Sequence, residues 1–459
     1  MTRFPRLCDA GLVLVATAMP LSAQGPSPKL PPIRPLKAPD MVAAERFSAV
    51  STVRALPGGR VLVNDIQGRR LLAFDSSLTT FSVVADTTSA TANAYASRIA
   101  GLIPWRGDSS LFVDPQTLSM LVLDGNAKVA RVMSVPRPDD AAALLGGNNG
   151  TPGIDAQGRL VYRAQPNMRA MFSGVQGAAT SGSGAFSSTP NIPDSVPLVR
   201  LTLATRKVDT VTFLKTTKIG MNITRDENGR MSVNTKINPM QVVDDWAILP
   251  DGRIAVVRGR DYHVDWYDGD NAVRSQPKLA FAWRPMTDSL KAAFIDSTRA
   301  FMEAQRERQL AAMKAGGNPM AVMPEGGPGG PGGGSPMVVM RFDGGGPPGG
   351  GDGGPRPSPG VQNIQLPPIN FVEPSELPDY APAFSGGSTR ADADGNLWIR
   401  TSLVVAGGSV YDVVNGKGEL VDRVQMPVGR VIAGFGPGGV VYMGVRQDGV
   451  ARLERARRP

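Results

Sequence analysis

The chain has 459 residues and a formal net charge of +9, with 41% hydrophobic and 19% charged residues. This composition argues against a fully disordered protein, because enough apolar surface is present to bury a large core. A single cysteine and a single histidine exclude a disulfide framework and argue against thiolate or histidine-rich metal centres.

The first 23 residues have the pattern of a secretory signal peptide. A basic start precedes an apolar stretch at 10–18, which is too short to span a bilayer, and small residues lead to a cleavage position after Ala23. The one cysteine, Cys8, precedes the apolar stretch, which argues against a lipoprotein. An uncleaved anchor is the alternative. We therefore expect an exported protein, periplasmic or extracellular.

One short phrase recurs six times along the chain. Each copy has an apolar lead, a tight turn and an alternating apolar run, which is typical of a β-hairpin. Further apolar runs follow each copy, and four short strands per repeat form one β-propeller blade. The copies are LPGGRVLVND (56–65), PWRGDSSLFVD (104–114), IDAQGRLVYRA (154–164), LPDGRIAVVRG (249–259), ADADGNLWIRT (391–401) and FGPGGVVYMGV (435–445).

The predicted fold is therefore all-β: a six-bladed β-propeller with a helical and Gly/Pro-rich insertion between blades four and five. Blades one to four are expected within 48–285, and blades five and six within 386–459. The last blade runs out of chain after three strands, and an unpaired edge strand is a liability. Residues 24–47 are available to supply a closing strand. A polar turn within 216–240 predicts a protruding hairpin.

The insertion, at 286–385, is predicted to have three parts. A helix is expected over 287–314, capped by Thr287, because its apolar residues recur at helical spacing. A Gly/Pro-rich segment over 316–360 is expected to be disordered, and a Pro-rich segment over 361–385 to be extended. The apolar face of the helix is formed by Leu290, Phe294, Phe301 and Met302.

The turn in the fifth copy contains acidic and amide side chains that resemble a calcium loop. Counted from Asp392, however, Gly395 is fourth rather than sixth, and Leu403 stands where an EF-hand needs glutamate. This stretch is therefore predicted to be a hairpin turn.

Two parts of the chain resemble the six-bladed NHL, TolB-like and gluconolactonase-like propeller superfamily. They are GGRVLVNDIQGRRLLAFD at 58–75, and DADGNLWI together with VYDVVNGKGELVDRV at 392–424. The resemblance covers most of 48–458 outside the insertions and implies a fold rather than an activity. Because gluconolactonase-like members hold one divalent metal at the channel mouth, it also implies a cation such as calcium as an alternative to no cofactor.

Seven polar residues near the innermost strands are candidates for a ligand site at the channel mouth. Their carboxylate and amide oxygens suit a hard cation, but the arginines would repel one. The arginines suit an anionic ligand, since guanidinium binds carboxylate and phosphate bidentately. The simpler expectation is that the arginines form structural ion pairs with Asp244, Asp245 and nearby carboxylates. The candidates are Arg54, Arg98, Asn148, Asn149, Asp244, Asp245 and Arg390.

The sole histidine, His263, has Asp265 on the same face of a predicted middle strand. A structural role is favoured over general-base catalysis, and no catalytic residue is assigned. We expect a non-enzymatic binding or scaffold protein of the cell envelope, and a monomer. Its partner would be an unknown protein or an anionic ligand rather than nucleic acid. The alternative is a divalent-metal-dependent, lactonase-like hydrolase.

Overall fold

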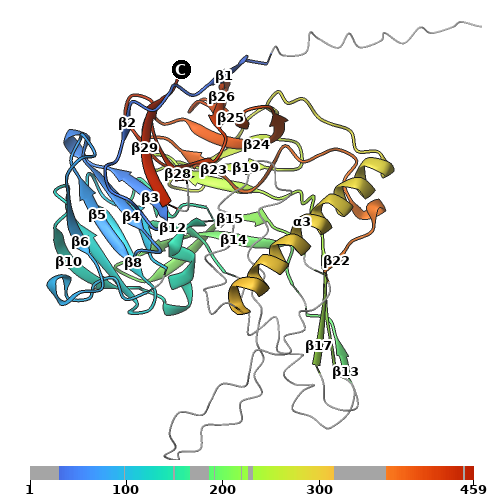
Figure 1. Cartoon of the computed structure of the whole chain (residues 1–459), viewed down its shortest axis with the longest axis horizontal. Helices are drawn as coiled ribbons and strands as arrows, with labels where there is room; N and C mark the ends of the chain where they lie inside the picture. The colour runs from blue at the N-terminus through green and yellow to red at the C-terminus, as the bar shows by residue number, and fades with distance from the viewer. Residues whose placement is uncertain are drawn as a thin grey trace, which may run out of the picture. The chain divides into compact units, whose positions relative to one another are not determined.

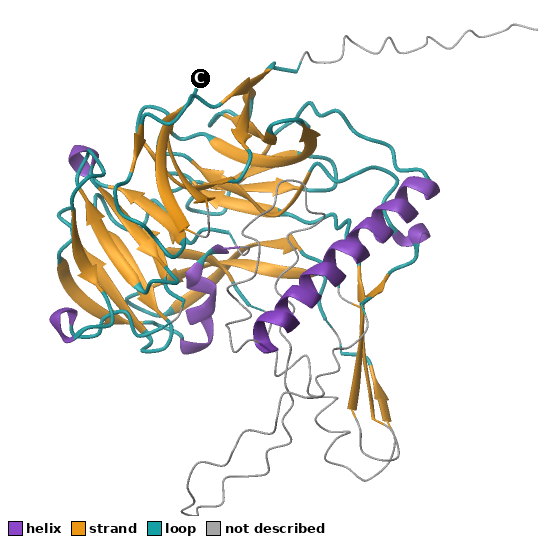
Figure 2. Cartoon of the chain, viewed as in Figure 1, coloured by secondary structure: helices purple, strands orange, loops and turns teal. Residues whose placement is uncertain are grey.

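The computed structural model describes most of the chain, and strands make up the larger part of it (Figure 2). One compact unit comprises Pro31–Pro459. No helix in the described ranges is long and apolar enough to cross a membrane. The predicted signal peptide and the predicted disordered segment lie outside the described residues. These are 30–97, 99–147, 150–165, 186–190, 192–218, 220–225, 231–314, 369–447 and 450–459.

Five sheets are antiparallel meanders in which strands pair in chain order (Figure 1). The first contains β3 (Val50–Ala55), β4 (Val61–Asp65), β5 (Arg70–Phe74) and β6 (Phe81–Ala85). The second contains β7 (Gly101–Pro104), β8 (Ser110–Asp114), β9 (Ser119–Leu123) and β10 (Val129–Ser134). The third contains β11 (Gly153–Ile154), β12 (Leu160–Arg163), β14 (Ser195–Thr202) and β15 (Lys207–Lys215). The fourth contains β18 (Asp245–Ile248), β19 (Ile254–Arg258), β20 (His263–Tyr267) and β21 (Val273–Ser275). The fifth contains β23 (Phe384–Ala391), β24 (Leu397–Val405), β25 (Gly408–Val414) and β26 (Leu420–Pro427).

A sixth sheet joins the two ends of the described chain. Its strands β27 (Arg430–Gly436), β28 (Val440–Gln447) and β29 (Val450–Arg457) form a meander, and β2 (Met41–Val42) pairs antiparallel with β29 as the fourth strand. An N-terminal strand thus borders the last sheet, at the edge that the sequence leaves unpaired. A second N-terminal strand, β1 (Ile33–Pro35), runs parallel to β26 and extends the fifth sheet.

A seventh sheet is assembled from segments that are far apart in the chain. Strands β16 (Gly220–Arg225) and β17 (Met231–Ile237) pair as an antiparallel hairpin, where a protruding hairpin is predicted. Strand β13 (Phe186–Ser188) borders β16, and β22 (Asn370–Phe371) runs parallel to β17. These two outer strands have no signal in the sequence, because each has only two or three residues.

Apolar clusters fill the spaces between the first six sheets. Six clusters each combine buried residues of two sheets that are successive in the chain or, in one case, of the last and the first. The cluster between the sixth and first sheets contains Tyr442 and Phe74, and the cluster between the third and fourth contains Val161 and Trp246. The first strands also touch directly: β27 contacts β3, β3 contacts β7, β7 contacts β11, and β18 contacts β23. The first strand of each sheet therefore lies next to the first strand of at least one other sheet.

The turns between first and second strands bring neighbouring sheets close together. Gly252, in the turn after β18, has φ +84°, and a Cβ on it would lie 2.2 Å from the backbone nitrogen of Ala156. Both its backbone conformation and its surroundings therefore require glycine. In the corresponding turn of the fifth sheet, Asp392 accepts hydrogen bonds from the backbone of Asn396 and from the Trp398 indole. The hairpin-turn interpretation of this stretch is confirmed.

Helix α3 (Asp288–Lys314) begins where Thr287 Oγ1 accepts a hydrogen bond from the Leu290 backbone. Half of the predicted apolar face is confirmed, because Phe294 and Met302 pack against an apolar cluster that contains Ile295 and Phe371. Leu290 and Phe301 are 49% and 41% exposed, whereas Lys291, Ile295 and Thr298 are buried. The sequence misleads here because Lys291 is buried through an ion pair of 2.8 Å with Asp379.

Candidate functional site

The structure describes four of the seven candidate residues. Arg54 lies on β3, Asp245 begins β18, Arg390 lies near the end of β23, and Asp244 immediately precedes β18. The remaining three lie outside the described residues: Arg98, Asn148 and Asn149.

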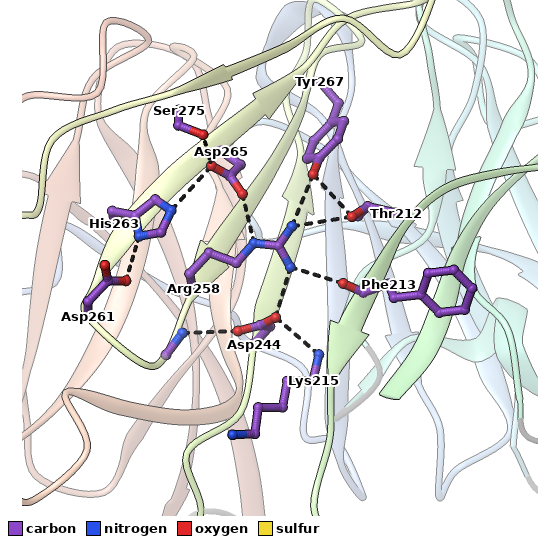
Figure 3. A network of polar contacts seen from close by, with 11 residues as sticks. Thr212, Phe213, Lys215, Asp244, Arg258, Asp261, His263, Asp265, Tyr267 and Ser275 are labelled. Carbon is purple, nitrogen blue, oxygen red and sulfur yellow. Dashed lines mark hydrogen bonds and ion pairs between the residues drawn. The ribbon is translucent and has the colours of Figure 1, made fainter. Parts of the chain in front are cut away.

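Asp244 belongs to a network of charged groups between the third and fourth sheets (Figure 3). Its Oδ2 lies 2.8 Å from a guanidinium nitrogen of Arg258 and 3.0 Å from the Lys215 backbone nitrogen. Its Oδ1 accepts a hydrogen bond from the Gly259 backbone at 3.1 Å. All of these contacts are structural, because they tie β19 and β15 to the entry of β18.

Arg258 bridges Asp244 to a second carboxylate, that of Asp265, at 2.7 Å (Figure 3). Burial lowers the pKa of the Arg258 guanidinium, but the hydrogen bonds that it donates to both carboxylates outweigh burial and raise the pKa. His263 lies 2.6 Å from Asp261 and 3.3 Å from Asp265 on the same face of β20. The histidine is therefore held among carboxylates of its own strand and turn, which fits the structural role favoured by the sequence.

The side chain of Asp245 points to the opposite face from that of Asp244, because successive residues of a strand face opposite sides. Its side chain is buried, and its Oδ2 accepts a hydrogen bond from the Thr389 backbone nitrogen at 2.7 Å. Burial raises the pKa of the Asp245 carboxyl despite hydrogen bonds from backbone nitrogens, including that of Gly387. The Thr389 hydroxyl lies near this carboxylate but makes no hydrogen bond of acceptable geometry.

Arg163, which the sequence did not single out, lies at the end of β12 close to Asp245. Burial lowers the pKa of its guanidinium, and the negative charge of Asp245 only partly offsets this effect. Arg163 forms no ion pair with any other described residue within 4.0 Å. Within the described ranges it is thus a half-buried cation without a bonded counterion.

Arg390 extends from β23 towards the third sheet. Its guanidinium donates a hydrogen bond of 3.3 Å to the hydroxyl of Thr151, which lies shortly before β11. Among the described residues it has no carboxylate within ion-pair distance. The hydrogen bonds of Arg390 with Thr151 and of Asp245 with Thr389, and the effect of the Asp245 charge on Arg163, link three sheets. We call these five residues the inner-strand cluster.

Arg54 is not part of this cluster. Its guanidinium makes one long contact of 3.5 Å with the Gly107 carbonyl, and its Nε is buried without a partner. Burial lowers the pKa of Arg54, and the nearby Asp108 carboxylate opposes this shift. The structure therefore does not bring Arg54 and Arg390 to one shared partner.

The expectation that the candidate arginines form ion pairs with Asp244 and Asp245 is wrong for Arg54 and Arg390. Asp244 pairs instead with Arg258 of its own sheet, and Asp245 is bonded by the backbone of β23. Most other arginines in the inter-sheet spaces do have carboxylate partners. Examples are Arg34, Arg70, Arg159, Arg253, Arg423, Arg430 and Arg455.

The inner-strand cluster does not have the composition of a metal site. Within the described ranges, no group of three or more His, Cys, Asp or Glu residues is placed to hold a metal ion. What the cluster offers is guanidinium and hydroxyl donors, which suit an oxyanion.

No protein-family model matches the sequence, and a search of curated proteins gave no match. Solved structures of similar fold include a calcium-binding protein, regucalcin, from Agrobacterium tumefaciens, with 9% identity, TM-score 0.38, and coverage of 94% of this chain and 98% of that one. A gluconolactonase from Xanthomonas campestris has 10% identity and TM-score 0.33, covering 93% and 98% of the two chains. TolB from Acinetobacter baumannii has 10% identity and TM-score 0.31, covering 89% and 64%. These proteins are β-propellers, so the resemblance is one of fold and carries no inference about activity.

Proposed function

We propose that the six meander sheets are the blades of one six-bladed β-propeller. Six apolar clusters, one between each successive pair of sheets and one between the last and the first, support a closed ring. The pairing of β2 with β29 supports closure by the N-terminal segment. Residues 286–385 and the seventh sheet are then additions to this ring.

We further propose that the protein is a non-enzymatic binding protein with an anionic ligand held at the inner-strand cluster. The observation that carries this proposal is half-buried Arg390, which donates to Thr151 of the third sheet and has no carboxylate within ion-pair distance among the described residues; half-buried Arg163 also lacks one there. An uncompensated buried charge is costly, so a site of this kind is stabilised when an anion occupies it. Arginine also provides paired donors that match carboxylate and phosphate.

Export to the periplasm or the extracellular space is part of the same proposal. It rests on the basic, apolar and small-residue pattern of the first 23 residues. Fractionation of cells that express the full chain tests it, with N-terminal sequencing of the product. A chain that begins at Gln24 in the exported fraction is expected, and an intact chain in the cytoplasm would overturn this part.

Anion binding is tested by titration calorimetry with succinate and with sulfate at constant ionic strength, using glucose as the neutral control. The wild-type protein is expected to bind at least one anion and not glucose. Arg390→Ala should lower the affinity about tenfold or more, because a bidentate charged contact is lost. Arg131→Ala is the matched control, since Arg131 is exposed on β10. Failure of the wild-type protein to bind either anion would overturn the proposal.

A different measurement distinguishes the binding protein from the alternative, which is a lactonase-like hydrolase that uses a divalent cation. If calcium raises the melting temperature by several degrees and EDTA reverses this, the alternative gains support. Binding of anions with no effect of calcium or EDTA favours the binding protein.

A further inference from the structure

A second arginine without a counterion lies on the same sheet as Arg390. Arg400 is half-buried on β24, and among the described residues its side chain forms no hydrogen bond or ion pair. Arg390, on the neighbouring strand β23, likewise has no carboxylate within ion-pair distance in that part of the chain. The fifth sheet therefore carries two partly buried cations that no described carboxylate neutralises.

Strand register places both arginines and Tyr411 on one face of the fifth sheet. Arg390 lies opposite Trp398 of β24, and Arg400, two residues further along β24, lies opposite Tyr411 of β25. Residues two apart on a strand share a face, and diagonal cross-strand positions are about 7–8 Å apart, which is within reach of long side chains. Consistently, burial raises the pKa of Tyr411, and the positive charges of Arg400 and Arg390 both oppose this rise. Both guanidinium groups are therefore near the Tyr411 side chain.

This face of the fifth sheet packs against the sixth sheet. One apolar cluster contains Trp398 and Tyr411 of the fifth sheet and Met443 of the sixth. Tyr411 is 6% exposed, and its hydroxyl forms no hydrogen bond with any described residue. Two like charges beside such a cluster repel each other more strongly than in water. An arginine of the facing sheet, Arg430, is instead neutralised by Glu454 at 2.6 Å. The uncompensated charges are thus a cost to the free protein that a structural role does not explain.

We propose that Arg390 and Arg400 jointly bind one oxyanion group between the fifth and sixth sheets, with the Tyr411 hydroxyl as a further hydrogen-bond donor. This inference rests on the proposed anion-binding function and adds two ligand-contacting residues to it. Each guanidinium offers paired donors that match carboxylate, sulfate and phosphate oxygens. Carboxylates and tetrahedral oxyanions share this chemistry, and succinate and sulfate represent the two sources.

Thermal melting separates a ligand-binding arginine from a structural one. Without an anion, Arg400→Gln should raise the melting temperature slightly, because it removes one of two neighbouring like charges. With succinate or sulfate at constant ionic strength, the wild-type protein should gain several degrees and Arg400→Gln much less. Arg131→Gln, on exposed β10, is the control for the general stabilising effect of sulfate. An Arg400→Gln protein that gains as much from both anions as the wild type would overturn the inference.

Calorimetry with the same two anions tests the hydroxyl donor. Tyr411→Phe should weaken binding of the preferred anion about tenfold, because a hydrogen bond to a charged group is lost, and should leave stability without an anion nearly unchanged. Tyr162→Phe is the matched control. The Tyr162 hydroxyl donates to Asp140 at 2.6 Å, so this variant should lose stability but not affinity.

The outcomes distinguish this inference from the proposed function. Binding of succinate alone would support the inference with a carboxylate ligand, and binding of sulfate alone would support it with a tetrahedral oxyanion. If Arg400→Gln and Tyr411→Phe bind the anion as the wild type does while Arg390→Gln does not, the inference is overturned and the proposed function stands. If the wild-type protein binds neither anion, the proposed function itself is removed.

Discussion

Arg258 illustrates how a charged residue is accommodated between sheets of this protein. Its guanidinium contacts two largely buried carboxylates, those of Asp244 and Asp265, and the Tyr267 hydroxyl at 3.0 Å. Every guanidinium nitrogen of Arg258 therefore donates a hydrogen bond to an acceptor. Arg163 and Arg390 are also partly buried but lack carboxylate partners in the described part of the chain, and for this reason we propose Arg390, and not Arg258, as a ligand donor.

Arg258→Met should destabilise the fold by about 3–5 kcal/mol, because it leaves two buried carboxylates without their cation. Urea denaturation at pH 7 measures this difference. Arg131→Met, on exposed β10, should change the free energy of unfolding by less than about 0.5 kcal/mol. An Arg258 variant as stable as the control would contradict the structural role of the network.

The same network predicts a dependence of stability on pH. Burial raises the pKa of Asp265, but hydrogen bonds from Ser275 and Arg258 and the nearby positive charges outweigh it, so the pKa is lowered overall. A lowered pKa in the folded state stabilises the protein above the unfolded-state pKa of about 4, and this contribution is lost as the pH falls through the folded-state value. The stability difference between wild type and Asp265→Asn should therefore shrink from pH 7 towards pH 3. A difference that is constant over this range would exclude the predicted linkage.

For single residues, the sequence predicts which ones lie near the first strands of the sheets. It does not predict the groups to which they form hydrogen bonds or ion pairs. Strand alternation shows that Asp244 and Asp245 face opposite sides, yet the cation of Asp244 comes from another strand and could not be identified. Arg163 was missed because it ends the second strand of its sheet, away from the residues before the turns from which the candidates were taken.

At the scale of elements, the residue that follows a turn glycine links one sheet to the next. In three sheets it is an arginine that donates a hydrogen bond to a glycine carbonyl in the turn between the third and fourth strands of the following sheet. The pairs are Arg60 with Gly125, Arg159 with Gly269, and Arg253 with Gly416. The Gly-Arg dipeptide of the repeat is thus an inter-sheet connection as well as a turn.

Arg253→Ala should lower the free energy of unfolding by about 1–2 kcal/mol, because it removes the bond to Gly416 at 3.0 Å and the stacking of the guanidinium over Trp266. Chemical denaturation provides the measurement. Arg274→Ala is the comparison, since Arg274 is exposed on β21 of the same sheet. Equal stability of the two variants would show that the connection contributes nothing.

Elements were predicted best where a single residue pattern determines them. Turn glycines and alternating runs located the meander strands, but only half of the predicted apolar face of α3 packs inwards, because, in place of Leu290 and Phe301, Lys291 and Thr298 are buried there. Their burial depends on partners outside the helix, such as Asp379. A helical periodicity of apolar residues cannot show this.

At the scale of the whole molecule, the two ends of the segment that contains α3 lie side by side. The Met286 backbone nitrogen donates to the Asp379 carbonyl at 2.8 Å, and the Ala381 nitrogen donates to the Arg284 carbonyl at 2.9 Å. An apolar cluster that includes Ile295 and Phe371, together with Met240 from outside this segment, packs around α3. Such an arrangement is expected of a part that was added to an existing fold.

Replacing residues 287–378 with a short Gly-Ser linker should therefore leave the remaining sheets folded. The melting temperature is expected to change by only a few degrees, and anion affinity should be unchanged, because no residue of the inner-strand cluster is removed. Calorimetric melting and the succinate titration measure the two effects. Loss of cooperative unfolding would show that the segment is integral to the fold.

The sequence was least informative about how distant segments combine. The repeats predict the meander sheets, but the seventh sheet brings together 186–188, 220–237 and 370–371, and nothing local in these segments encodes their pairing.

One carboxylate holds both ends of the described chain. Asp422 lies 2.7 Å from a guanidinium nitrogen of Arg34 and 3.0 Å from that of Arg458, and β2 completes the sheet of β29 nearby. The contacts that join these ends span almost the whole sequence, and contacts of such high sequence separation form slowly during folding. The sixth sheet gains its fourth strand only when β2, near one end of the described chain, reaches β29, near the other end. Closure is therefore expected to be the slow, late step of folding, and the seam between the first and last sheets the place where partially folded chains remain open.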